Sequence, residues 1–323
     1  MVGIIFKECP IRGIDISQYN DRLDTPKTID FNKAKEGGVD YVVIRTSYGV
    51  VTDKSFRNSW ADSKGILPRR PYHYLDYYSH LFMGISDTEW GKRQARAVWE
   101  LIKDDNDGSI VWLDVESASV APKIETLMPR VISIMGAFFS EMDKLNGKTN
   151  GLYSAASYLQ YFYKKFGNRP LWIAWYNESK TKESILNFVK STGWTGKVYD
   201  WQYTSDGDIN GDSIGDGIVL GMEEKRLDLN MCLLSEEEFR NSFSVVVEEP
   251  PVVVPPIVVL PSTTKLVKVM TVTVGSLRIR TLPSLKGTIT DYLPKDQEVE
   301  VLEEINDWAR IGYKQYCSMS YLK

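Results

Sequence analysis

The sequence predicts an α/β protein: an irregular (β/α)8 barrel of the TIM type, followed by a small all-β barrel. Apolar, β-branched runs alternate with segments of helical period across residues 1–244, a pattern typical of strands joined by helical crossovers. A proline-rich stretch interrupts the pattern at 245–264, and short strand-like runs recur from 265 to 323. We therefore expect a barrel domain, a linker and a small second domain.

Eight runs in the first domain are expected to form the barrel strands, because each is short, apolar and bounded by turn residues. They are residues 11–17, 41–49, 70–79, 109–117, 150–158, 170–177, 198–205 and 226–231. Helical patterns at Asp53–Gly65 and Lys123–Leu145 follow two of them, which favours parallel pairing. The later connections are too short for full helices, so we expect an irregular second half of the barrel.

The linker is defined by its prolines, which are too frequent for a helix or an internal strand. We expect an extended, semi-rigid spacer. After it, six short strand-like runs at close spacing predict a small all-β barrel; they are 268–274, 276–283, 287–294, 298–306, 308–313 and 317–323.

Composition excludes several classes of function. The 323 residues carry a net charge of -4, which gives no basic field for nucleic acid. Three widely spaced cysteines, Cys9, Cys232 and Cys317, make no disulfide framework or zinc cluster, so we expect buried free thiols. The N-terminal residues lack the pattern of a signal peptide, and no apolar stretch is long enough to span a bilayer. We expect no cofactor, no metal, no nucleic-acid partner and no membrane anchor.

Acidic residues are concentrated where barrel strands are expected to end. Asp114 and Glu116 lie two apart at the end of the fourth run, so a strand projects both side chains to one face. Asp15 and Asp228 occupy the corresponding ends of the first and eighth runs, which become neighbours when the barrel closes. Since the C-terminal strand ends of a parallel barrel build its active site, we expect the four acids to converge there.

Convergent carboxyls repel one another, which raises at least one pKa, as a proton donor in glycoside hydrolysis requires. A single Asp-x-Glu pair is equally typical of a solvated turn or a helix N-cap. A metal site is the other alternative, and the chain has only two histidines. Four acids on three separate strands favour the catalytic interpretation.

Several motifs in order along residues 10–243 resemble glycoside hydrolase family 25, the Chalaropsis-type lysozymes found among phage endolysins and bacterial autolysins. They are Asp15-x-Ser17-x-Tyr19-Asn20, Asp53-x-x-Phe56-x-Asn58-x-x-Ala61, Pro71-Tyr72-His73-Tyr74, Asp114-Val115-Glu116, Trp201-Gln202-Tyr203 and Asp228-x-Asn230. The C-terminal segment resembles bacterial SH3-like wall-binding domains, through Leu277-x-Ile279-Arg280-x-x-Pro283, Gly287-Thr288-Ile289 and Trp308-Ala309-Arg310-Ile311. It departs from them at 314–319, where a usual Gly-Tyr pair is replaced.

The resemblance implies a muramidase that cleaves the β-1,4 bond between N-acetylmuramic acid and N-acetylglucosamine in bacterial peptidoglycan, with retention of configuration. Glu116 matches the family's general acid, and Asp15, Asp114 and Asp228 match its other acids. Whether a carboxylate attacks directly or Asp114 orients the substrate's acetamido group stays open. A barrel that only grips glycan and a chitinase-like hydrolase are the alternative functions.

Aromatic and amide side chains near the strand ends are expected to line the glycan groove. We assign this role to Tyr74, Tyr153, Trp175, Trp201 and Gln202, and wall binding in the small domain to Tyr292, Trp308 and Tyr313. His73 is expected to have a structural or a catalytic role, and Arg45 to pair with Asp15 or another acid.

An acidic loop at 206–217 copies the first positions of a calcium loop, but position twelve is Gly217 rather than a bidentate glutamate. We interpret it as a solvated Gly/Asp turn, with calcium binding as the alternative. For the whole chain we expect a phage endolysin, made in the host cytoplasm and acting at the cell wall. A bacterial autolysin exported by another route is the alternative.

Overall fold

The computed structural model describes residues 9–22, 28–118, 121–176, 180–210, 214–243, 268–287, 289–301, 303–312 and 315–323. The chain divides into two compact units, Met1–Val247 and Glu248–Lys323. The predicted linker, 245–264, lies outside the described residues, so its limits stay a prediction.

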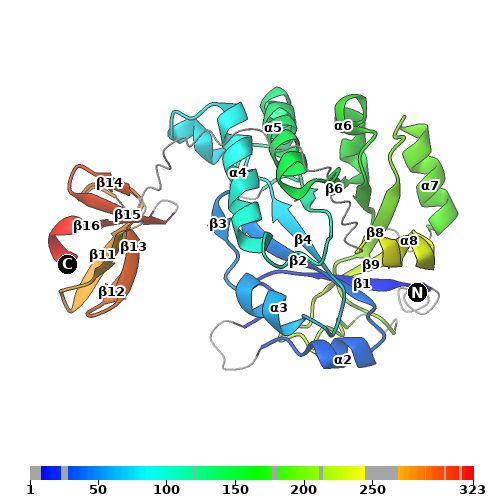
Figure 1. Ribbon diagram of the computed structural model, residues 1–323, viewed down its shortest axis with the longest axis horizontal. Helices are drawn as coiled ribbons and strands as arrows, with labels where there is room; N and C mark the ends of the chain where they lie inside the picture. The colour runs from blue at the N-terminus through cyan, green and yellow to red at the C-terminus, as the bar shows by residue number, and fades with distance from the viewer. Residues whose placement is uncertain are drawn as a thin grey trace, which may run out of the picture. The chain divides into compact units, whose positions relative to one another are not determined.

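Eight strands of the first unit close into a barrel, as expected (Figure 1). Around the barrel the order is β1, β9, β8, β7, β6, β5, β4 and β2, and β1 pairs with β2 to complete the circle. Their bounds are β1 Arg12–Ile16, β2 Tyr41–Tyr48, β4 Arg69–Tyr74, β5 Trp112–Asp114, β6 Gly151–Ala155, β7 Leu171–Ala174, β8 Val198–Thr204 and β9 Asp228–Cys232. The short β3, Val51–Thr52, forms a hairpin with the end of β2.

The last strand corrects the expectation of an all-parallel barrel. β9 is antiparallel to both of its neighbours, β1 and β8. A parallel pair needs a crossover, usually a helix, and the described residues between β8 and β9 contain turns but no helix. The chain therefore turns back, and β9 enters the barrel from the end where β8 leaves it.

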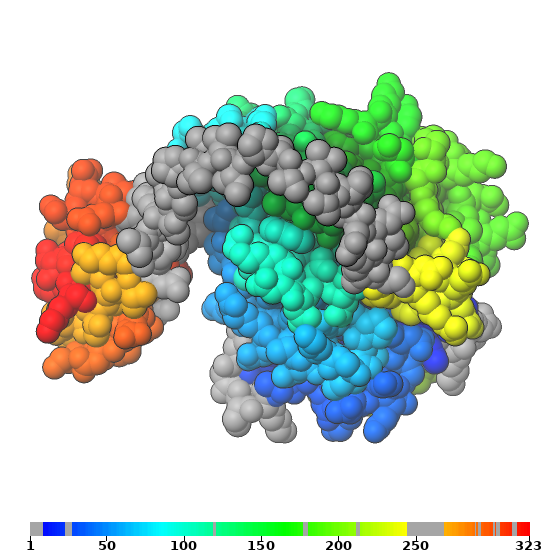
Figure 2. Space-filling view, in the orientation of Figure 1, coloured from blue at the N-terminus to red at the C-terminus, as the bar shows by residue number. Residues whose placement is uncertain are grey.

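Helices cover the outside of the barrel (Figure 1). They are α2 Phe31–Glu36, α3 Phe56–Asp62, α4 Asp87–Ile102, α5 Met128–Asn146, α6 Leu159–Phe166, α7 Lys182–Ser191 and α8 Glu236–Asn241, with 3-10 turns η1 Ser79–Phe82, η2 Ile124–Leu127 and η3 Ala156–Tyr158. Both predicted helices are present, the first as α3 and the second as η2 continued by α5. The blue segments around α2 and the green segments around α6 and α7 form opposite edges of this unit (Figure 2).

Two individual residues explain where α4 starts and how closely it packs against α5. Ser86 caps α4 by accepting from the backbone N–H of Glu89, which satisfies a donor that the helix leaves free. α4 approaches α5 so closely that a Cβ on Gly91 would lie 2.3 Å from the carbonyl oxygen of Ile134. Glycine is therefore required at this crossing.

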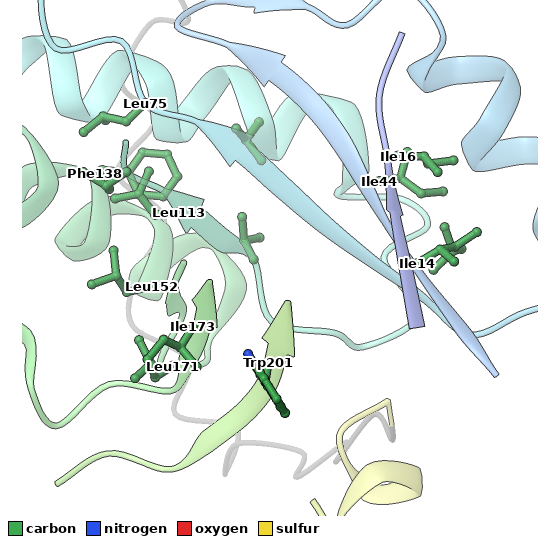
Figure 3. Close-up of a cluster of buried hydrophobic side chains, with 14 of the residues drawn as sticks. Ile14, Ile16, Ile44, Leu75, Leu113, Phe138, Leu152, Leu171, Ile173 and Trp201 are labelled. Atoms are coloured by element: carbon green, nitrogen blue, oxygen red, sulfur yellow. The ribbon is translucent and has the colours of Figure 1, made fainter. Parts of the chain in front are cut away.

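The strands carry two apolar layers because successive side chains point to opposite faces. Outward residues pack against the helices in one apolar cluster. Figure 3 labels ten residues of this cluster, among them Phe138 of α5 and Leu75, which follows β4; the other eight are Ile14, Ile16, Ile44, Leu113, Leu152, Leu171, Ile173 and Trp201. Inward residues fill the barrel with large aromatic rings, among them Tyr41, Tyr72, Trp112, Tyr153 and Trp172. Small residues make room for these rings, since a Cβ on Gly13 would lie 2.2 Å from the ring of Tyr41.

A buried ion pair lies inside the barrel, near the N-terminal ends of the parallel strands. Arg70 Nη1 lies 2.5 Å from Asp200 Oδ2, and the hydroxyl of Tyr41 donates to the other oxygen of Asp200 at 2.6 Å. The guanidinium also donates to Ser242 Oγ, just after α8, and lies 4.9 Å from the ring centroid of Phe243. Arg70 thus ties the end of α8 to the barrel.

The second unit is the expected small all-β domain. Its strands are β10 Lys268–Thr271, β11 Ser276–Arg280, β12 Ile289–Pro294, β13 Glu298–Val301, β14 Glu303–Ile305, β15 Trp308–Gly312 and β16 Gln315–Ser318, followed by η4 Met319–Tyr321. They form a two-stranded sheet, β10-β13, and a five-stranded sheet, β12-β11-β16-β15-β14. One apolar core, which includes Val272, Ala309 and Cys317, lies between them.

All three cysteines are free and buried, as predicted. In the part of the chain that the structure describes, no helix is both long enough and apolar enough to cross a membrane.

Candidate active site

The four predicted acids gather at one mouth of the barrel. Asp15 and Asp114 lie near the C-terminal ends of β1 and β5, and Glu116 follows two residues after Asp114. Asp228 is directly opposite Asp15 in the antiparallel pairing of β1 with β9. It reaches this mouth as the first residue of its strand rather than the last, because β9 runs in the reverse direction.

Asp15 is the centre of a hydrogen-bond network inside the barrel. Its Oδ2 accepts from Asn230 Nδ2 at 2.8 Å and from Gln202 Nε2 at 2.9 Å. Asp228 also forms a side-chain hydrogen bond with Asp15, in which Asp15 is the acceptor. Burial raises the pKa of Asp15 to about 6, against the opposing effect of these three hydrogen bonds.

The other three acids also have raised pKa values. Burial raises the pKa of Asp228 well above its usual range, and the negative charge of Asp15 adds to the effect. The pKa of Asp114 is raised well above its usual range by burial and then by the charges of Glu116 and Asp15. Burial, followed by the charge of Asp15, raises the pKa of Glu116, whereas Arg45 opposes the increase. A raised pKa favours the protonated form of a carboxyl group, which is the form that a general acid needs.

Glu116 is the acid that faces a cavity. The cavity has a volume of about 460 Å³ and is lined by Glu116, Tyr153, Ala155, Ala156, Ser157, Ala174, Trp175, Tyr176 and Phe188. Glu116 is only partly buried, so a bound molecule can reach its carboxyl group. A larger cavity, of about 980 Å³, lies near the start of α2 and contains none of the four acids in its lining.

The prediction that Trp201 lines the glycan groove is wrong. The Trp201 side chain is fully buried among the apolar residues between barrel and helices (Figure 3), and its indole N–H donates to the carbonyl of Trp175 at 2.9 Å. Since Gln202 is the next residue on the strand and points into the barrel, Trp201 must point to the outer face. It has no exposed ring on which a sugar can stack.

Gln202 and Tyr153 lie at the mouth, but both are largely buried. The hydroxyls of Tyr153 and Tyr176 each donate to Gln202 Oε1 at 2.7 Å. Gln202 therefore contacts Asp15 and two tyrosines, rather than offering its amide to a substrate.

Trp175 and Tyr74 are both partly exposed. Trp175 lines the cavity and packs against Phe188 of α7, with ring centroids 4.4 Å apart. Tyr74 pairs with Asp114 in the register of β4 and β5, and its ring lies 5.2 Å from that of Tyr48. A sugar-binding role for these two side chains stays a prediction.

The sequence interpretation assigned no role to Tyr176, Trp172 or Asn230, although Asn230 belongs to the motif Asp228-x-Asn230. Tyr176 is 55% exposed and lines the cavity. Asn230 holds Asp15, and Trp172 Nε1 in turn donates to Asn230 Oδ1 at 2.7 Å. Strand alternation was the available signal for Trp172, which shares parity with Ala174 on β7 and points inward.

His73 has the structural role that was one of its two predicted roles. It points outward and stacks on Phe138, with ring centroids 5.2 Å apart. Its two nitrogens lie within hydrogen-bond distance of Ser47 Oγ and Gln94 Oε1. Burial lowers the pKa of His73 to about 4, so the imidazole is neutral at physiological pH.

Arg45 pairs with an acid other than Asp15. Its Nε lies 2.6 Å from Asp53 Oδ2, and its guanidinium lies 5.1 Å from the ring centroid of Tyr19. The same Asp53 oxygen accepts from the backbone N–H of Gln18. The ion pair therefore holds the segment after β1 beside the mouth.

The carboxylates of the acidic loop turn toward the loop's own backbone. Asp208 Oδ1 accepts from the N–H of Asn210, and Asp216 Oδ2 accepts from the N–H of Ile209. Residues 211–213 of the loop lie outside the described part. Among the described residues, no group of three or more His, Cys, Asp or Glu is placed to hold a metal ion.

In the small domain, two of the predicted wall-binding residues can be located. Tyr292 is 54% exposed and pairs with Arg278 in the register of β11 and β12. Trp308 is partly exposed and precedes the buried Ala309 on β15, so it points away from the core. Tyr313 lies outside the described residues, and wall binding by all three stays a prediction.

A closed barrel with four carboxyls at its mouth, one of them beside an aromatic-lined cavity, defines a glycoside hydrolase. Residues 14–212 match the family model "Glycosyl hydrolases family 25", and residues 275–323 match "Bacterial SH3 domain". The chain belongs to glycosyl hydrolases family 25. The predicted family, its muramidase class and the SH3-like second domain are thereby confirmed.

Solved structures show the same barrel. A family 25 glycosyl hydrolase from Bacillus anthracis is 20% identical with a TM-score of 0.53, over 73% of this chain and 94% of that one. A family GH25 lysozyme from Aspergillus fumigatus is 20% identical with a TM-score of 0.51, over 72% and 99%. The modular autolysin LytC from Streptococcus pneumoniae, in complex with a synthetic peptidoglycan ligand, is 21% identical with a TM-score of 0.51, over 69% and 46%. None of the curated proteins matches this sequence.

Proposed function

We propose that this enzyme hydrolyses the β-1,4 bond between N-acetylmuramic acid and N-acetylglucosamine in bacterial peptidoglycan, with Glu116 as the general acid. The observation that carries the proposal is the placement of Glu116. It is the member of the four acids that lines the cavity, its pKa is raised by burial, and aromatic rings lie beside it. A protonated carboxyl in this position can donate to the glycosidic oxygen of a sugar chain in the cavity.

The surroundings of Asp114 support the proposed cleavage of an N-acetylated glycan. Asp114 is buried, and its Oδ1 has no hydrogen-bond partner among the described residues. A buried oxygen without a partner is costly unless a ligand supplies one. The acetamido N–H of the substrate is a donor of the right kind, and its carbonyl oxygen would then lie near the anomeric carbon. This arrangement favours assistance by the substrate over direct attack by Asp114.

Identifying the new reducing ends tests the proposed bond. Purified protein is incubated with walls from several Gram-positive species, the products are reduced with borohydride, and the reduced sugars are identified. We expect the reduced form of N-acetylmuramic acid, and Glu116→Gln as the matched control is expected to release almost none. Reduced N-acetylglucosamine as the main product, or efficient cleavage of chitin oligomers, would contradict the proposed specificity.

The biological role that we propose is lysis of the host wall at phage release, with the SH3 domain as the wall anchor. The pairing of a family 25 barrel with a bacterial SH3 domain supports an enzyme that acts on walls. The test is expression inside a bacterium with a susceptible wall. We expect growth to continue until the membrane is permeabilised and rapid lysis afterwards, whereas lysis without permeabilisation would favour an exported autolysin.

A further inference from the structure

Trp172 lies inside the barrel, below the acids. It is linked to Asp15 through one residue, Asn230, which hydrogen-bonds to both. The Trp172 side chain is 1% exposed. Its Nε1 donates to Asn230 Oδ1 at 2.7 Å, and Asn230 Nδ2 donates to Asp15 Oδ2 at 2.8 Å. An indole N–H can only donate, so it fixes which end of the Asn230 amide is oxygen. The NH2 group must therefore face Asp15.

Gln202 provides a second donor to the same carboxylate oxygen, at 2.9 Å. Its Oε1 accepts from two tyrosine hydroxyls, those of Tyr153 and Tyr176. Two amide groups, each held at its oxygen, thus point N–H donors at one oxygen of Asp15. Hydrogen bonds to the charged form of a carboxyl group favour that form over the neutral one.

We propose that Trp172 is a positioning residue for the reaction, which holds Asp15 ionised and in one orientation under the sugar by locking the amide of Asn230. The inference rests on the proposed function, because it assigns Asp15 the negative charge that faces the positively charged transition state of glycan cleavage. Trp172 does not line the cavity that Glu116 faces, and its burial keeps it from contact with a substrate. It acts only through Asn230.

Other charged and titratable groups also face Asp15. Asp228 donates to it from β9, and Asp200 lies below it on β8. Across the mouth it is near Asp114, Glu116 and the hydroxyl of Tyr72. Arg45 is the cation that acts on Asp114 and Glu116. The charge of Asp200 disfavours a charge on Asp15, whereas the hydrogen bonds from Asn230, Gln202 and Asp228 favour it.

Removing the indole N–H frees the Asn230 amide to turn its oxygen toward Asp15. The hydrogen bond from Asn230 to the Asp15 carboxylate is then lost or replaced by repulsion. Because this bond stabilises the charge that faces the transition state, we expect its loss to lower kcat by about tenfold or more. KM is expected to change little, because Trp172 does not contact the substrate. Since Asp15 then loses its proton only at higher pH, the acid limb of the kcat/KM profile moves up by about one pH unit.

The experiment compares Trp172→Phe with Trp112→Phe in the full chain. Trp112 is a matched control because it is also fully buried in the same aromatic layer, with its ring 6.1 Å from that of Trp172. Its Nε1 has no hydrogen-bond partner among the residues that the structure describes. Both substitutions replace an indole by a phenyl ring and so remove the same volume, but only Trp172→Phe removes a hydrogen bond. Phenylalanine keeps an aromatic ring in this layer at either position, so we expect the larger shift of the pH profile in Trp172→Phe.

Two results would overturn the inference: equal shifts of the pH profile in both variants, or a profile of Trp172→Phe that matches the unsubstituted enzyme. If Trp172→Phe does not fold, Asn230→Ser removes the same donor to Asp15 and is expected to give the same shift. A readout without substrate separates this inference from the proposed function. The titration of the Asp15 carboxyl carbon is followed by NMR in the resting protein, assigned with Asp15→Asn. It is expected to move to higher pH in Trp172→Phe even if peptidoglycan is not the substrate.

Discussion

The buried ion pair between Arg70 and Asp200 gives a quantitative prediction about the stability of the barrel. Arg70→Met keeps a long apolar side chain but leaves the carboxylate of Asp200 buried without its cation. Both side chains are at most 1% exposed, and removing one partner of a buried pair costs about 3–5 kcal/mol. The loss is expected to be at the upper end, because Arg70 also donates to Ser242 and stacks near four aromatic rings.

The assay is thermal and urea unfolding of the full chain, followed by near-UV circular dichroism. For a domain of this size, 1 kcal/mol corresponds to a change of about 2–4 °C in Tm, so a loss at the upper end lowers Tm by roughly 10–20 °C. Arg93→Met is the matched control, since Arg93 forms an exposed ion pair with Glu89 one helical turn away. Exposed pairs contribute roughly 0–1 kcal/mol. A loss in Arg70→Met no larger than in Arg93→Met would refute the reasoning, because it would mean that water replaces the guanidinium at low cost.

Three further predictions concern the site and the two units. Glu116→Gln is expected to lower peptidoglycan hydrolysis by about 10²–10⁴-fold with Tm unchanged, and unaltered turnover would remove Glu116 from the acid role. Burial and the neighbouring Glu223 raise the pKa of Asp21 to about 6, so its contribution to stability is present at pH 4 and is lost as pH rises through 6. The stability of Asp21→Asn relative to the unsubstituted protein should therefore rise by about 1 kcal/mol between pH 4 and 7, after allowance for screening by solvent, and a constant difference in urea unfolding would contradict this. A reporter fused to residues 265–323 is expected to sediment with susceptible walls while residues 1–243 alone bind weakly, and equal retention of both would refute the anchoring role.

Local patterns were sufficient to predict the strands and the meeting of the four acids. Each barrel strand is a short apolar run, and Asp114 and Glu116 are two residues apart, so their shared position follows from strand periodicity alone. Pairing across the barrel was harder to predict. Asn230 and Trp172 are 58 residues apart, and no local pattern indicates that one donates to the other.

The predicted direction of β9 was wrong, because the direction of a strand depends on the segment that connects it to the previous strand and not on its own residues. A run such as that around Asp228 has the same appearance in either direction, and only the absence of a crossover helix before it implies reversal. The placement of Trp201 was wrong for a different reason. Adjacent residues cannot both face the barrel interior, so assigning both Trp201 and Gln202 to the groove conflicts with strand alternation.

The interior of the barrel explains why the acids at its mouth hold protons so readily. Below them lies a layer of rings that includes Tyr72, Trp112 and Trp172, and these rings keep water away from the lower side of the carboxyls. Burial is accordingly the largest cause of the raised pKa at Asp15 and at Glu116. Glycines in β1 and β6 make this layer possible, since a Cβ on Gly13 or Gly151 would overlap Tyr41 or Trp112. The proton affinity that glycan cleavage requires is therefore set by residues deep in the barrel as well as by the acids themselves.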